Sequence, residues 1–441
     1  MSINHNRMKK AIALFALIAA LLSSGACKTQ QKNVKDITAK TSDTTSVSEV
    51  SKSESSVWHP SSVSVISEGP SSDASDTQSS VVSQTSIDPM YNVPAEYCDN
   101  GIFSAYYEDA YRYLSSMTLD EKIGQMLIAG LPYEDEIEIA RENHLGGYVL
   151  FAKDFSYLTK EQVISKISSL AISQKVPLCI AVDEEGGTVS RISSNKELTP
   201  HEFKSPRELY KSGGMAYIQS DADEKATLLH ELGIDVNLAP VCDISTNKSD
   251  FMYSRSLGED AKTTADYVRI VTELSQKRGV SVTLKHFPGY GSNSDTHTGS
   301  SVDSRTIDDL KKNDLIPFEA GIKAGAHLVM VSHNTVNCID ENNPASLSPD
   351  VHKLLRKDMG FTGLIITDDL SMGAISNYKG EETPVVAAVI AGNDLLIINS
   401  SMIESSISSI KAAIESGKIT EDMINRAAFR IIAWKYARGM M

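Results

Sequence analysis

The sequence predicts an α/β fold, a parallel (β/α)8 TIM-type barrel over residues 91–441, preceded by a signal peptide and a disordered Ser/Thr-rich tether. Two observations predict the barrel. Short, nearly continuous apolar runs alternate with amphipathic helical stretches, which is typical of parallel strands buried on both faces. Ionisable side chains stand at the carboxyl ends of most of these runs, and the active sites of such barrels lie where the strands end. Because periodicity does not decide closure, a doubly wound open sheet stays the alternative.

Eight apolar runs are the expected strands. In chain order they are 123–130, 147–152, 178–183, 234–240, 280–286, 327–332, 364–368 and 394–399. Stretches with helical periodicity separate them, the clearest being 159–173, 222–232, 263–277, 306–324 and 348–358, and a last helix is expected from about residue 421. Strands that alternate with helices in this way indicate βαβ units. The length of 91–441 suits one barrel with loop insertions.

Residues 1–27 are expected to be a lipoprotein-type signal peptide. A basic start precedes the apolar run 11–22, which is shorter than the roughly 20 residues that a membrane-spanning helix needs. The small residues at 24–26 lead into Cys27, as in a bacterial lipobox, where the cysteine is lipidated after cleavage. We therefore expect an extracytoplasmic protein, lipid-anchored through Cys27 to the bacterial cell membrane and facing the cell wall. An ordinary secretory signal is the alternative.

Residues 28–90 are expected to form a disordered linker. They are rich in Ser and Thr and poor in large apolar residues, so they bury too little apolar surface to offset their chain entropy. A flexible tether of this length has an r.m.s. reach of roughly 40–45 Å. It would let a folded domain at 91–441 sample the space around its anchor.

Composition and cysteine usage exclude several classes of protein. The net charge of -15 argues against a nucleic-acid partner, which would call for a basic patch. Cys179 lies within an apolar run and Cys242 directly follows one, so both are expected to be small buried hydrophobes. No spacing typical of a zinc site and no phosphate-binding glycine pattern is present. No metal or organic cofactor and no obligate protein partner is implied.

The segment 285–291, followed by Asp295 and His297, carries the strongest chemical signal. It places two cations and a glycine-rich turn directly after an expected strand. A histidine two residues from a carboxylate is a plausible general acid/base with its orienting partner. A lone histidine on a polar loop is more often merely solvated, but the combination favours catalysis. Other polar residues that close or follow apolar runs are Asp183, Asp243, Lys285, His286, His333, Asp368 and Asn399.

This segment resembles the K-H-F-P-G-x-G…D-x-H pattern of glycoside hydrolase family 3, in its β-N-acetylglucosaminidase branch. The resemblance covers about 115–400 and includes the segments 182–187, 237–243, 253–258 and 366–372, together with Arg191. It implies a retaining exo-β-N-acetylglucosaminidase (a β-N-acetylhexosaminidase) that hydrolyses terminal GlcNAc from peptidoglycan fragments or chitooligosaccharides.

The resemblance also implies roles for individual residues. Asp368 matches the nucleophile that forms a covalent glycosyl-enzyme, and His297 matches the acid/base with Asp295 as its partner. Asp369 competes with Asp368 on sequence grounds, but adjacent strand residues point to opposite faces, so only one should face the site if the strand geometry persists to this end. The resemblance selects Asp368, and Asp369 is interpreted as a structural carboxylate. A loop position would let the acid/base pair swing in over the substrate. The matching sugar-binding residues are Asp183, Arg191, Arg255, Lys285 and His286.

Three features depart from the family's patterns. Thr188 stands where many members of this branch carry arginine, and the stretch between the turn glycines and Asp295 is one residue shorter than in many members. Related β-glucosidases take the acid/base from a second domain after the barrel. No such domain follows in this sequence, so the acid/base is expected from Asp295 and His297.

Alternative functions stay open from the sequence. A β-N-acetylglucosaminide phosphorylase or a β-glucosidase of the same family would use the same barrel. In another mechanism the substrate's own acetamido group is the nucleophile, assisted by an acidic pair such as Asp183 and Glu184. A lipoprotein that binds glycans without turning them over is the alternative from a different class.

Overall fold

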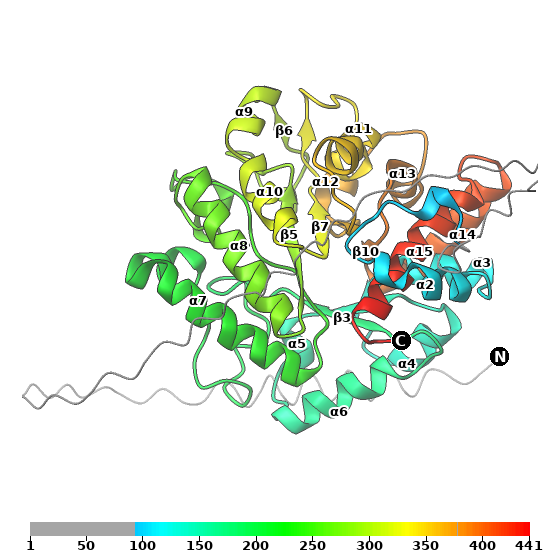
Figure 1. Cartoon of the computed structure of the whole chain (residues 1–441), viewed down its shortest axis with the longest axis horizontal. Coiled ribbons are helices and arrows are strands. Elements are labelled where there is room, and N and C mark those ends of the chain that lie inside the picture. Colours follow the sequence, from blue (N-terminus) through cyan, green and yellow to red (C-terminus); the bar gives the residue numbers. More distant parts are fainter. Residues whose placement is uncertain (1–92, 377) are drawn as a thin grey trace, which may run out of the picture. The chain divides into compact units, whose positions relative to one another are not determined.

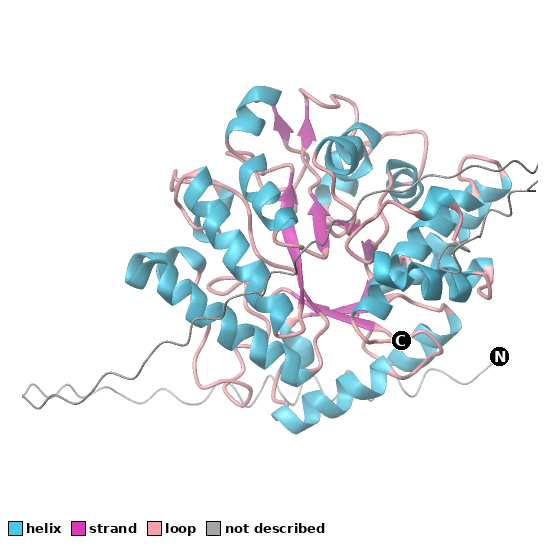
Figure 2. Ribbon diagram, viewed as in Figure 1, coloured by secondary structure: helices cyan, strands magenta, loops and turns pink. Residues whose placement is uncertain are grey.

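The computed structural model describes residues 93–376 and 378–441. Eight strands form one parallel sheet in the order β10-β1-β2-β3-β4-β5-β7-β9. The outer members β9 and β10 are joined by a parallel bridge between Ile366 and Leu395. The sheet therefore closes on itself with helices around it, as Figures 1 and 2 show. The predicted (β/α)8 barrel is confirmed.

The barrel strands are β1 (Leu127–Gly130), β2 (Gly147–Leu150), β3 (Cys179–Val182), β4 (Val236–Asn237), β5 (Ser281–Phe287), β7 (Leu328–Val331), β9 (Leu364–Thr367) and β10 (Leu396–Ile398). A small parallel pair, β6 (Val302–Asp303) and β8 (Thr335–Val336), lies outside the barrel sheet. The helices are α2 (Tyr107–Leu114), α3 (Leu119–Gln125), α4 (Glu136–Glu142), α5 (Ala152–Phe155), α6 (Lys160–Ala171), α7 (Pro206–Leu232), α8 (Ala261–Lys277), α9 (Ile307–Lys312), α10 (Leu315–Lys323), α11 (Pro349–Lys353), α12 (Gly373–Ser376), α13 (Pro384–Ala391), α14 (Ile403–Glu415) and α15 (Glu421–Ala437). Short helical turns are η1 (Ala95–Tyr97), η2 (Ser104–Tyr106), η3 (Phe251–Ser254), η4 (Ala345–Leu347), η6 (Ser400–Met402) and the π-helical turn η5 (Leu354–Asp358).

Three expected elements differ from the observed ones. The expected strand 123–130 is wrong in its first part, because Thr118 and Glu121 form a capping box that begins helix α3, and the strand starts only after it. The expected helix 306–324 is two helices, α9 and α10, separated at Asn313 and Asp314. The helix expected at 222–232 is α7, which begins much earlier, at Pro206.

The early start of α7 has a local cause. Ser205 accepts a hydrogen bond from the N–H of Glu208, and Pro206 stands at the first helical position. Both are strong signals for the beginning of a helix. The glycines Gly213 and Gly214 interrupt its helical backbone, and this interruption hides the helical periodicity of the first turns.

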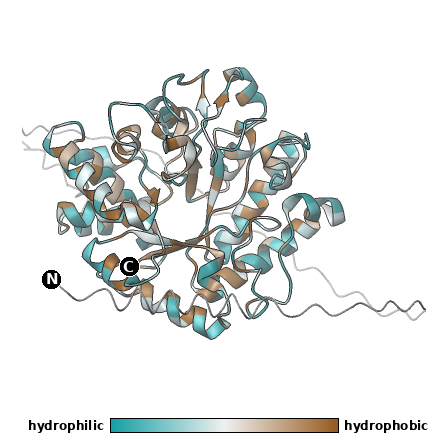
Figure 3. Ribbon diagram, turned by 180° about the vertical axis from the view of Figure 1, so that it is seen from behind, coloured by the Kyte–Doolittle hydropathy of each residue, from teal (hydrophilic) through white to brown (hydrophobic). Residues whose placement is uncertain are grey.

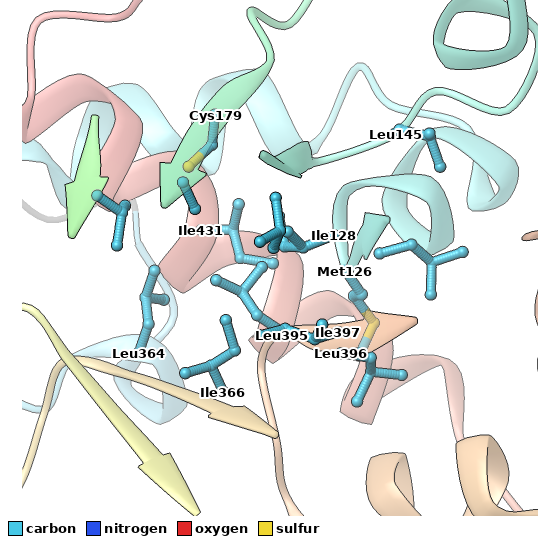
Figure 4. Packing of buried hydrophobic residues seen from close by; sticks show 14 of the residues in the cluster. Met126, Ile128, Leu145, Cys179, Leu364, Ile366, Leu395, Leu396, Ile397 and Ile431 are labelled. Atoms are coloured by element: carbon cyan, nitrogen blue, oxygen red, sulfur yellow. The ribbon is translucent and has the colours of Figure 1, made fainter. Parts of the chain in front are cut away.

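The core lies inside the barrel and between its strands and the outer helices. Figure 4 shows part of it, with Ile128, Leu364 and Ile366 from the barrel strands and Ile431 from α15. Seen from behind, the hydrophobic strands lie at the centre, and hydrophilic stretches occur on the helices around them (Figure 3). Such burial, at about 25 cal/mol per Å² of apolar surface, is the main favourable contribution to folding.

Helix α15 closes the amino-terminal end of the barrel. The Lys435 ammonium is fully buried and donates to Gln125 Oε1 (2.7 Å), the Gly146 carbonyl (3.0 Å) and the Pro177 carbonyl (2.7 Å). These acceptors immediately precede strands β1, β2 and β3, so one side chain ties three strand starts together. Burial lowers the pKa of Lys435 to about 8.

Asp235 lies at the same end, one residue before β4. Its carboxylate accepts a hydrogen bond from the N–H of Ile180 at 2.8 Å. Burial raises the pKa of Asp235 to about 6, against the lowering effects of that hydrogen bond and of two nearby cations. In such barrels this face serves stability rather than catalysis.

The predictions for the cysteines and the amino-terminal segments have different outcomes. Cys179 and Cys242 are buried and unpaired, as predicted. The expected signal peptide at 1–27, its lipidation site Cys27 and the expected linker at 28–90 lie outside the described residues. Within the described part of the chain, no helix combines the length and apolar character needed to cross a membrane.

Candidate active site

A cavity of about 760 Å³ opens at the carboxyl ends of the barrel strands. All eight residues that the sequence assigns to catalysis or sugar binding line it: Asp183, Arg191, Arg255, Lys285, His286, Asp295, His297 and Asp368. They come from five separate regions of the sequence, after strands β3, β4 and β9, at the end of β5 and on the loop that follows β5. The structure thus brings these eight residues to one place, while their individual roles stay predictions.

A network of buried charges forms the floor of the cavity. Lys285 Nζ lies 2.8 Å from Asp183 Oδ1 and 2.6 Å from Glu185 Oε1. Arg255 donates to both oxygens of Glu185, from Nε at 2.9 Å and from Nη2 at 2.6 Å. Arg191 Nη2 lies 3.9 Å from Asp183 Oδ2. Each charged group of the network therefore has an oppositely charged neighbour, which is the condition for burying ionised groups.

Glu185 is the centre of this network, and the sequence did not assign it a role. Its side chain is 1 % exposed. Burial would raise the pKa of Glu185, but the Lys285 ammonium and the Arg255 guanidinium hold it well below the usual range of a glutamate. The carboxylate therefore stays ionised and fixes both cations that line the cavity. The signal that could have found it is its place two residues after Asp183 in the same motif.

His286 is oriented by Asp243. The imidazole Nδ1 lies 2.7 Å from Asp243 Oδ2, and the carboxylate also accepts from the backbone N–H groups of His286 (3.1 Å) and Tyr290 (2.6 Å). His286 Nε2 lies 3.3 Å from Arg255 Nη2. The sequence left Asp243 without a role. In the structure it is buried and positions the imidazole through hydrogen bonds, as carboxylates behind functional histidines often do.

Asp368 stands one residue after β9 and is half-buried. Its Oδ1 accepts a hydrogen bond from the N–H of Asp369 at 2.8 Å. Burial would raise the pKa of the Asp368 carboxyl, but His333 and His286 hold it below the usual value of an aspartate. An ionised carboxylate in a protein cavity, facing a bound substrate, has the properties of a nucleophile or a stabiliser of positive charge.

Both Asp368 and Asp369 line the cavity, so the expectation that only one of them faces it, which assumed that the strand continues to this pair, is wrong. The physical reason is that β9 ends at Thr367, so strand alternation does not extend to this pair. Asp369 Oδ1 accepts from the N–H and the hydroxyl of Ser371, at 2.8 and 2.7 Å. These hydrogen bonds agree with its interpretation as a structural carboxylate.

The buried His333 supports the backbone under this pair. Its Nδ1 lies 2.7 Å from Ser346 Oγ, and its Nε2 lies 3.0 Å from the Asp369 carbonyl. Burial lowers the pKa of His333, against the raising effects of the Asp368 carboxylate and of the hydrogen bond to the Asp369 carbonyl. Asn399, the last of the polar residues that close apolar runs, caps the turn η6 by accepting from Ser401 N–H at 3.0 Å.

The Asp295–His297 pair lies at the mouth of the cavity. His297 Nδ1 is 2.6 Å from Asp295 Oδ1, and the His297 side chain is 57 % exposed. With its Nδ1 proton donated to the carboxylate, the ring leaves Nε2 to exchange a proton with a bound molecule. Between the two, Thr296 is buried, and its N–H donates to the Tyr290 hydroxyl at 2.9 Å. The site thus offers an ionised carboxylate deep in the cavity and a proton-transfer group at its mouth.

Across 93–376 and 378–441, no cluster of three or more His, Cys, Asp or Glu residues has an arrangement that could hold a metal ion.

Comparison with known proteins places the chain among glycosidases. The model of the glycosyl hydrolase family 3 N-terminal domain matches residues 118–434. A β-hexosaminidase, LpqI, of Mycobacterium tuberculosis is 30% identical over 324 residues, which cover 71% of this chain and 82% of the relative. A β-hexosaminidase of Stenotrophomonas maltophilia is 32% identical over 260 residues, covering 58% and 76% respectively.

A solved structure agrees with the sequence matches. A family 3 β-N-acetylglucosaminidase from Paenibacillus sp. superposes with a TM-score of 0.69 at 31% identity and covers 74% of this chain. The present chain spans 63% of that protein's chain. The family predicted from the sequence is confirmed. This chain belongs to glycoside hydrolase family 3 and is a glycoside hydrolase.

Proposed function

We propose that the protein is a retaining exo-β-N-acetylglucosaminidase that removes terminal GlcNAc from peptidoglycan fragments or chitooligosaccharides. One observation carries the proposal: Asp368 and the Asp295–His297 pair line the same cavity. In this arrangement an imidazole takes the place of the second carboxylic acid that most retaining glycosidases use for proton transfer. The names of the relatives, β-hexosaminidase and β-N-acetylglucosaminidase, support the choice of sugar.

In the proposed first step, the Asp368 carboxylate attacks the anomeric carbon while His297 gives its Nε2 proton to the glycosidic oxygen. The bond to the leaving group breaks and a covalent glycosyl-enzyme forms. In the second step His297 takes a proton from water, which attacks the same carbon and releases GlcNAc and the free carboxylate. Asp295 orients the imidazole and stabilises its charged form throughout.

The network of buried charges would bind the sugar. Sugar hydroxyls both donate and accept hydrogen bonds, so Asp183 and Lys285 can each serve one of them. Hydrogen bonds with an ionised partner are roughly twice as strong as neutral ones. Because Glu185 already fixes Lys285 and Arg255, little side-chain freedom is lost when the substrate binds.

The test is hydrolysis of an aryl β-N-acetylglucosaminide and the matching aryl β-glucoside by the full chain. We expect preference for the N-acetyl sugar. The variant Asp368→Asn should lose activity, and His297→Ala should lose about 10²–10⁴-fold in kcat/KM. His230→Ala, at an exposed histidine on the far end of the barrel, is the matched control and should leave kcat/KM unchanged.

Other outcomes point to other functions. Preference for the glucoside would make the protein a β-glucosidase, and release of GlcNAc-1-phosphate in phosphate buffer would make it a phosphorylase. Full activity of Asp368→Asn would exclude the covalent mechanism and favour participation of the substrate's acetamido group. Binding of glycans without turnover in any buffer would indicate a glycan-binding lipoprotein.

We also propose that the protein is anchored to the outer face of the cell membrane by a lipid on Cys27. The basic start, the apolar run 11–22 and the small residues before Cys27 support this location. Growth with an alkyne-labelled fatty acid should label the wild-type protein in the membrane fraction. Cys27→Ser should abolish the label, and labelling of that variant would contradict the proposal.

A further inference from the structure

Two tyrosines stand almost free of the protein at the carboxyl ends of neighbouring strands. Tyr157 is 98 % exposed and Tyr133 is 87 % exposed, more than any other large hydrophobic residue in the described part of the chain. Tyr133 follows β1, and Tyr157 follows β2 and the short helix α5. Because β1 and β2 are adjacent in the barrel sheet, both tyrosines belong to the face of the barrel that holds the active-site cavity. These two residues are called here the tyrosine rim.

Contacts connect the rim to the wall of the active-site cavity. Phe151 lines the cavity and directly follows β2, and a Cβ at Gly130, the last residue of β1, would lie 3.6 Å from its ring. Two residues further on, Lys153 Nζ lies 3.9 Å from the centroid of the Tyr133 ring. Only α5 and two residues separate Phe151 from Tyr157, so their Cα atoms lie within roughly 16 Å of each other. The rim is therefore a continuation of the cavity wall.

The turn that presents Tyr157 has an unusual backbone conformation and is firmly held. Tyr157 has φ +63°, in the left-handed region that bulky residues rarely adopt. Asn195 Nδ2 donates to the carbonyls on both sides of this turn, those of Phe155 at 2.8 Å and Leu158 at 2.9 Å. Asn195 belongs to the same segment between β3 and α7 as Arg191, which lines the cavity. The turn is thus fixed relative to the cavity wall.

Stability of the fold does not account for a tyrosine at position 157. Its ring is almost fully exposed, so it gains little from the hydrophobic effect. Glycine would adopt the same φ without strain. Strained backbone conformations of this kind cluster at active sites and at sites that hold ligands. A ring that is held in water by a fixed turn is suited to contact a ligand.

A sugar ring is the ligand that suits exposed tyrosines beside the cavity of a glycoside hydrolase. The C–H groups on one face of a pyranose ring form an apolar surface, and the negative face of an aromatic ring attracts groups with a partial positive charge. The tyrosine hydroxyl can also donate to and accept from the hydroxyls of the sugar. A glycan bound at the rim stays within reach of the active-site cavity.

The surroundings of the rim disfavour a membrane or a protein as its partner. Glu134 and Asp135 follow Tyr133 and are exposed, so they would repel the anionic surface of a membrane. Within residues 131–160, all of which the structure describes, no large hydrophobic residue other than the two tyrosines is exposed. The core of a protein–protein interface is a contiguous apolar patch, and the rim consists of separate rings among polar residues.

We propose that the tyrosine rim is a second glycan-binding surface, on which a polymer of β-linked, N-acetylated amino sugars stacks outside the active-site cavity. Chitin and the glycan strands of peptidoglycan share this chemistry. The inference goes beyond the proposed function. It adopts the proposed choice of sugar, but it does not depend on the proposed roles of Asp368 and His297.

The test measures binding of the full chain to suspended chitin and to purified peptidoglycan, by depletion from the supernatant. We expect Tyr133→Ala and Tyr157→Ala each to raise Kd by about twofold to tenfold, as for the loss of one aromatic contact. The double variant should raise Kd by the product of the two effects. Ile172→Ala, at a residue 79 % exposed before β3 at the opposite end of the barrel, is the matched control and should bind as the wild type does. The polymer whose binding depends on the rim identifies the source of the glycan.

Further variants at position 157 separate binding from stability. Tyr157→Gly should weaken binding as Tyr157→Ala does, but it should have the higher thermal midpoint of the two, because glycine adopts the left-handed conformation without strain. Tyr157→Phe keeps the face of the ring and should retain most of the binding. In kinetic assays, the alanine variants should lower the release of GlcNAc from the polymer relative to hydrolysis of the aryl β-N-acetylglucosaminide, which has no second sugar to place on the rim.

The outcomes judge the two proposals separately. If the wild type binds neither polymer, or if the double variant binds both as the wild type does, the rim proposal is wrong. Binding to phosphatidylglycerol vesicles, or a dimer in sedimentation equilibrium, that depends on the rim when glycan binding does not would assign the surface to a membrane or to a second copy, and would also overturn the proposal. Failure to cleave the aryl substrate would overturn the proposed function, whereas glycan binding that depends on the rim would still support the second surface.

Discussion

Replacing Glu185 by glutamine should damage both stability and activity. The variant keeps the shape of the side chain but removes its charge. Lys285 then retains only Asp183 as an anionic partner, at 2.8 Å. Arg255 loses its bidentate partner, whose hydrogen bonds are 2.9 and 2.6 Å long. Removing one member of a buried ion pair costs about 3–5 kcal/mol, and the remaining Asp183 contact favours the lower end.

The catalytic effect follows from the same contacts. Both cations line the active-site cavity, and a misplacement of about 1 Å can cost about 10²-fold in rate. We therefore expect Glu185→Gln to lower the free energy of unfolding by about 3 kcal/mol and kcat/KM for the aryl substrate by about 100-fold. Urea denaturation followed by circular dichroism, with steady-state kinetics on the same preparation, measures both.

A surface pair provides the control. Glu138 pairs with Arg141 at 3.4 Å, with both side chains more than half exposed. Such pairs contribute little, so Glu138→Gln should change the free energy of unfolding by less than about 0.5 kcal/mol. The reasoning about Glu185 would be refuted if its variant behaved like this control in both assays.

Two further predictions concern other parts of the barrel. The folded-state pKa of Asp235 is raised to about 6, so the folded protein binds more protons than the unfolded chain above the usual aspartate pKa. Stability should fall as pH rises from about 4 to 6, by on the order of 2 kcal/mol. Asp235→Asn, which can still accept from Ile180, should remove this fall; a variant with the wild-type pH dependence of urea midpoints would contradict the assignment. Gly289 has φ +120°, and a Cβ there would lie 2.6 Å from Asp314, so Gly289→Ala should cost about 1–3 kcal/mol. Gly299→Ala, on the same loop with open space around it, should be neutral in the same denaturation assay, and equal effects would refute the strain argument.

The barrel could be predicted from the sequence because its signals are local. Each strand is a short apolar run, and each run has its own place in the chain order. The start of the first strand was predicted wrongly because a local signal was overlooked. The capping box of Thr118 and Glu121 makes the first half of that apolar run part of helix α3. The separation of α9 from α10 has no such marker. Asp314 stands at this break, and its carboxylate accepts from Arg305 at 2.7 Å.

The candidate site was predictable only in part, for a physical reason. A sequence motif identifies the side chains that face the cavity. The charged side chains that fix their positions follow other strands, far away in the sequence. Glu185 follows β3, yet its partners are Arg255 after β4 and Lys285 on β5. Asp243 likewise acts through His286, distant in sequence. Such pairings form only when the barrel is closed, so they cannot be predicted from the spacing of residues along the chain.

Tyr290 connects the carboxylate that orients His286 with the loop that carries Asp295 and His297. Its N–H donates to Asp243, which orients His286, and its hydroxyl contacts Thr296, which lies between the proposed acid/base residues. Tyr290 and Thr296 are both buried, with 2 % and 1 % of their surface exposed. The loop is therefore fixed at its centre, and any swing of His297 over a substrate has to pivot about Thr296 or break buried hydrogen bonds. A pivot of this kind would move the imidazole while the hydrogen bonds that orient His286 stay intact, so the proposed proton transfer could adjust to the leaving group without disturbing the cations proposed to bind the sugar.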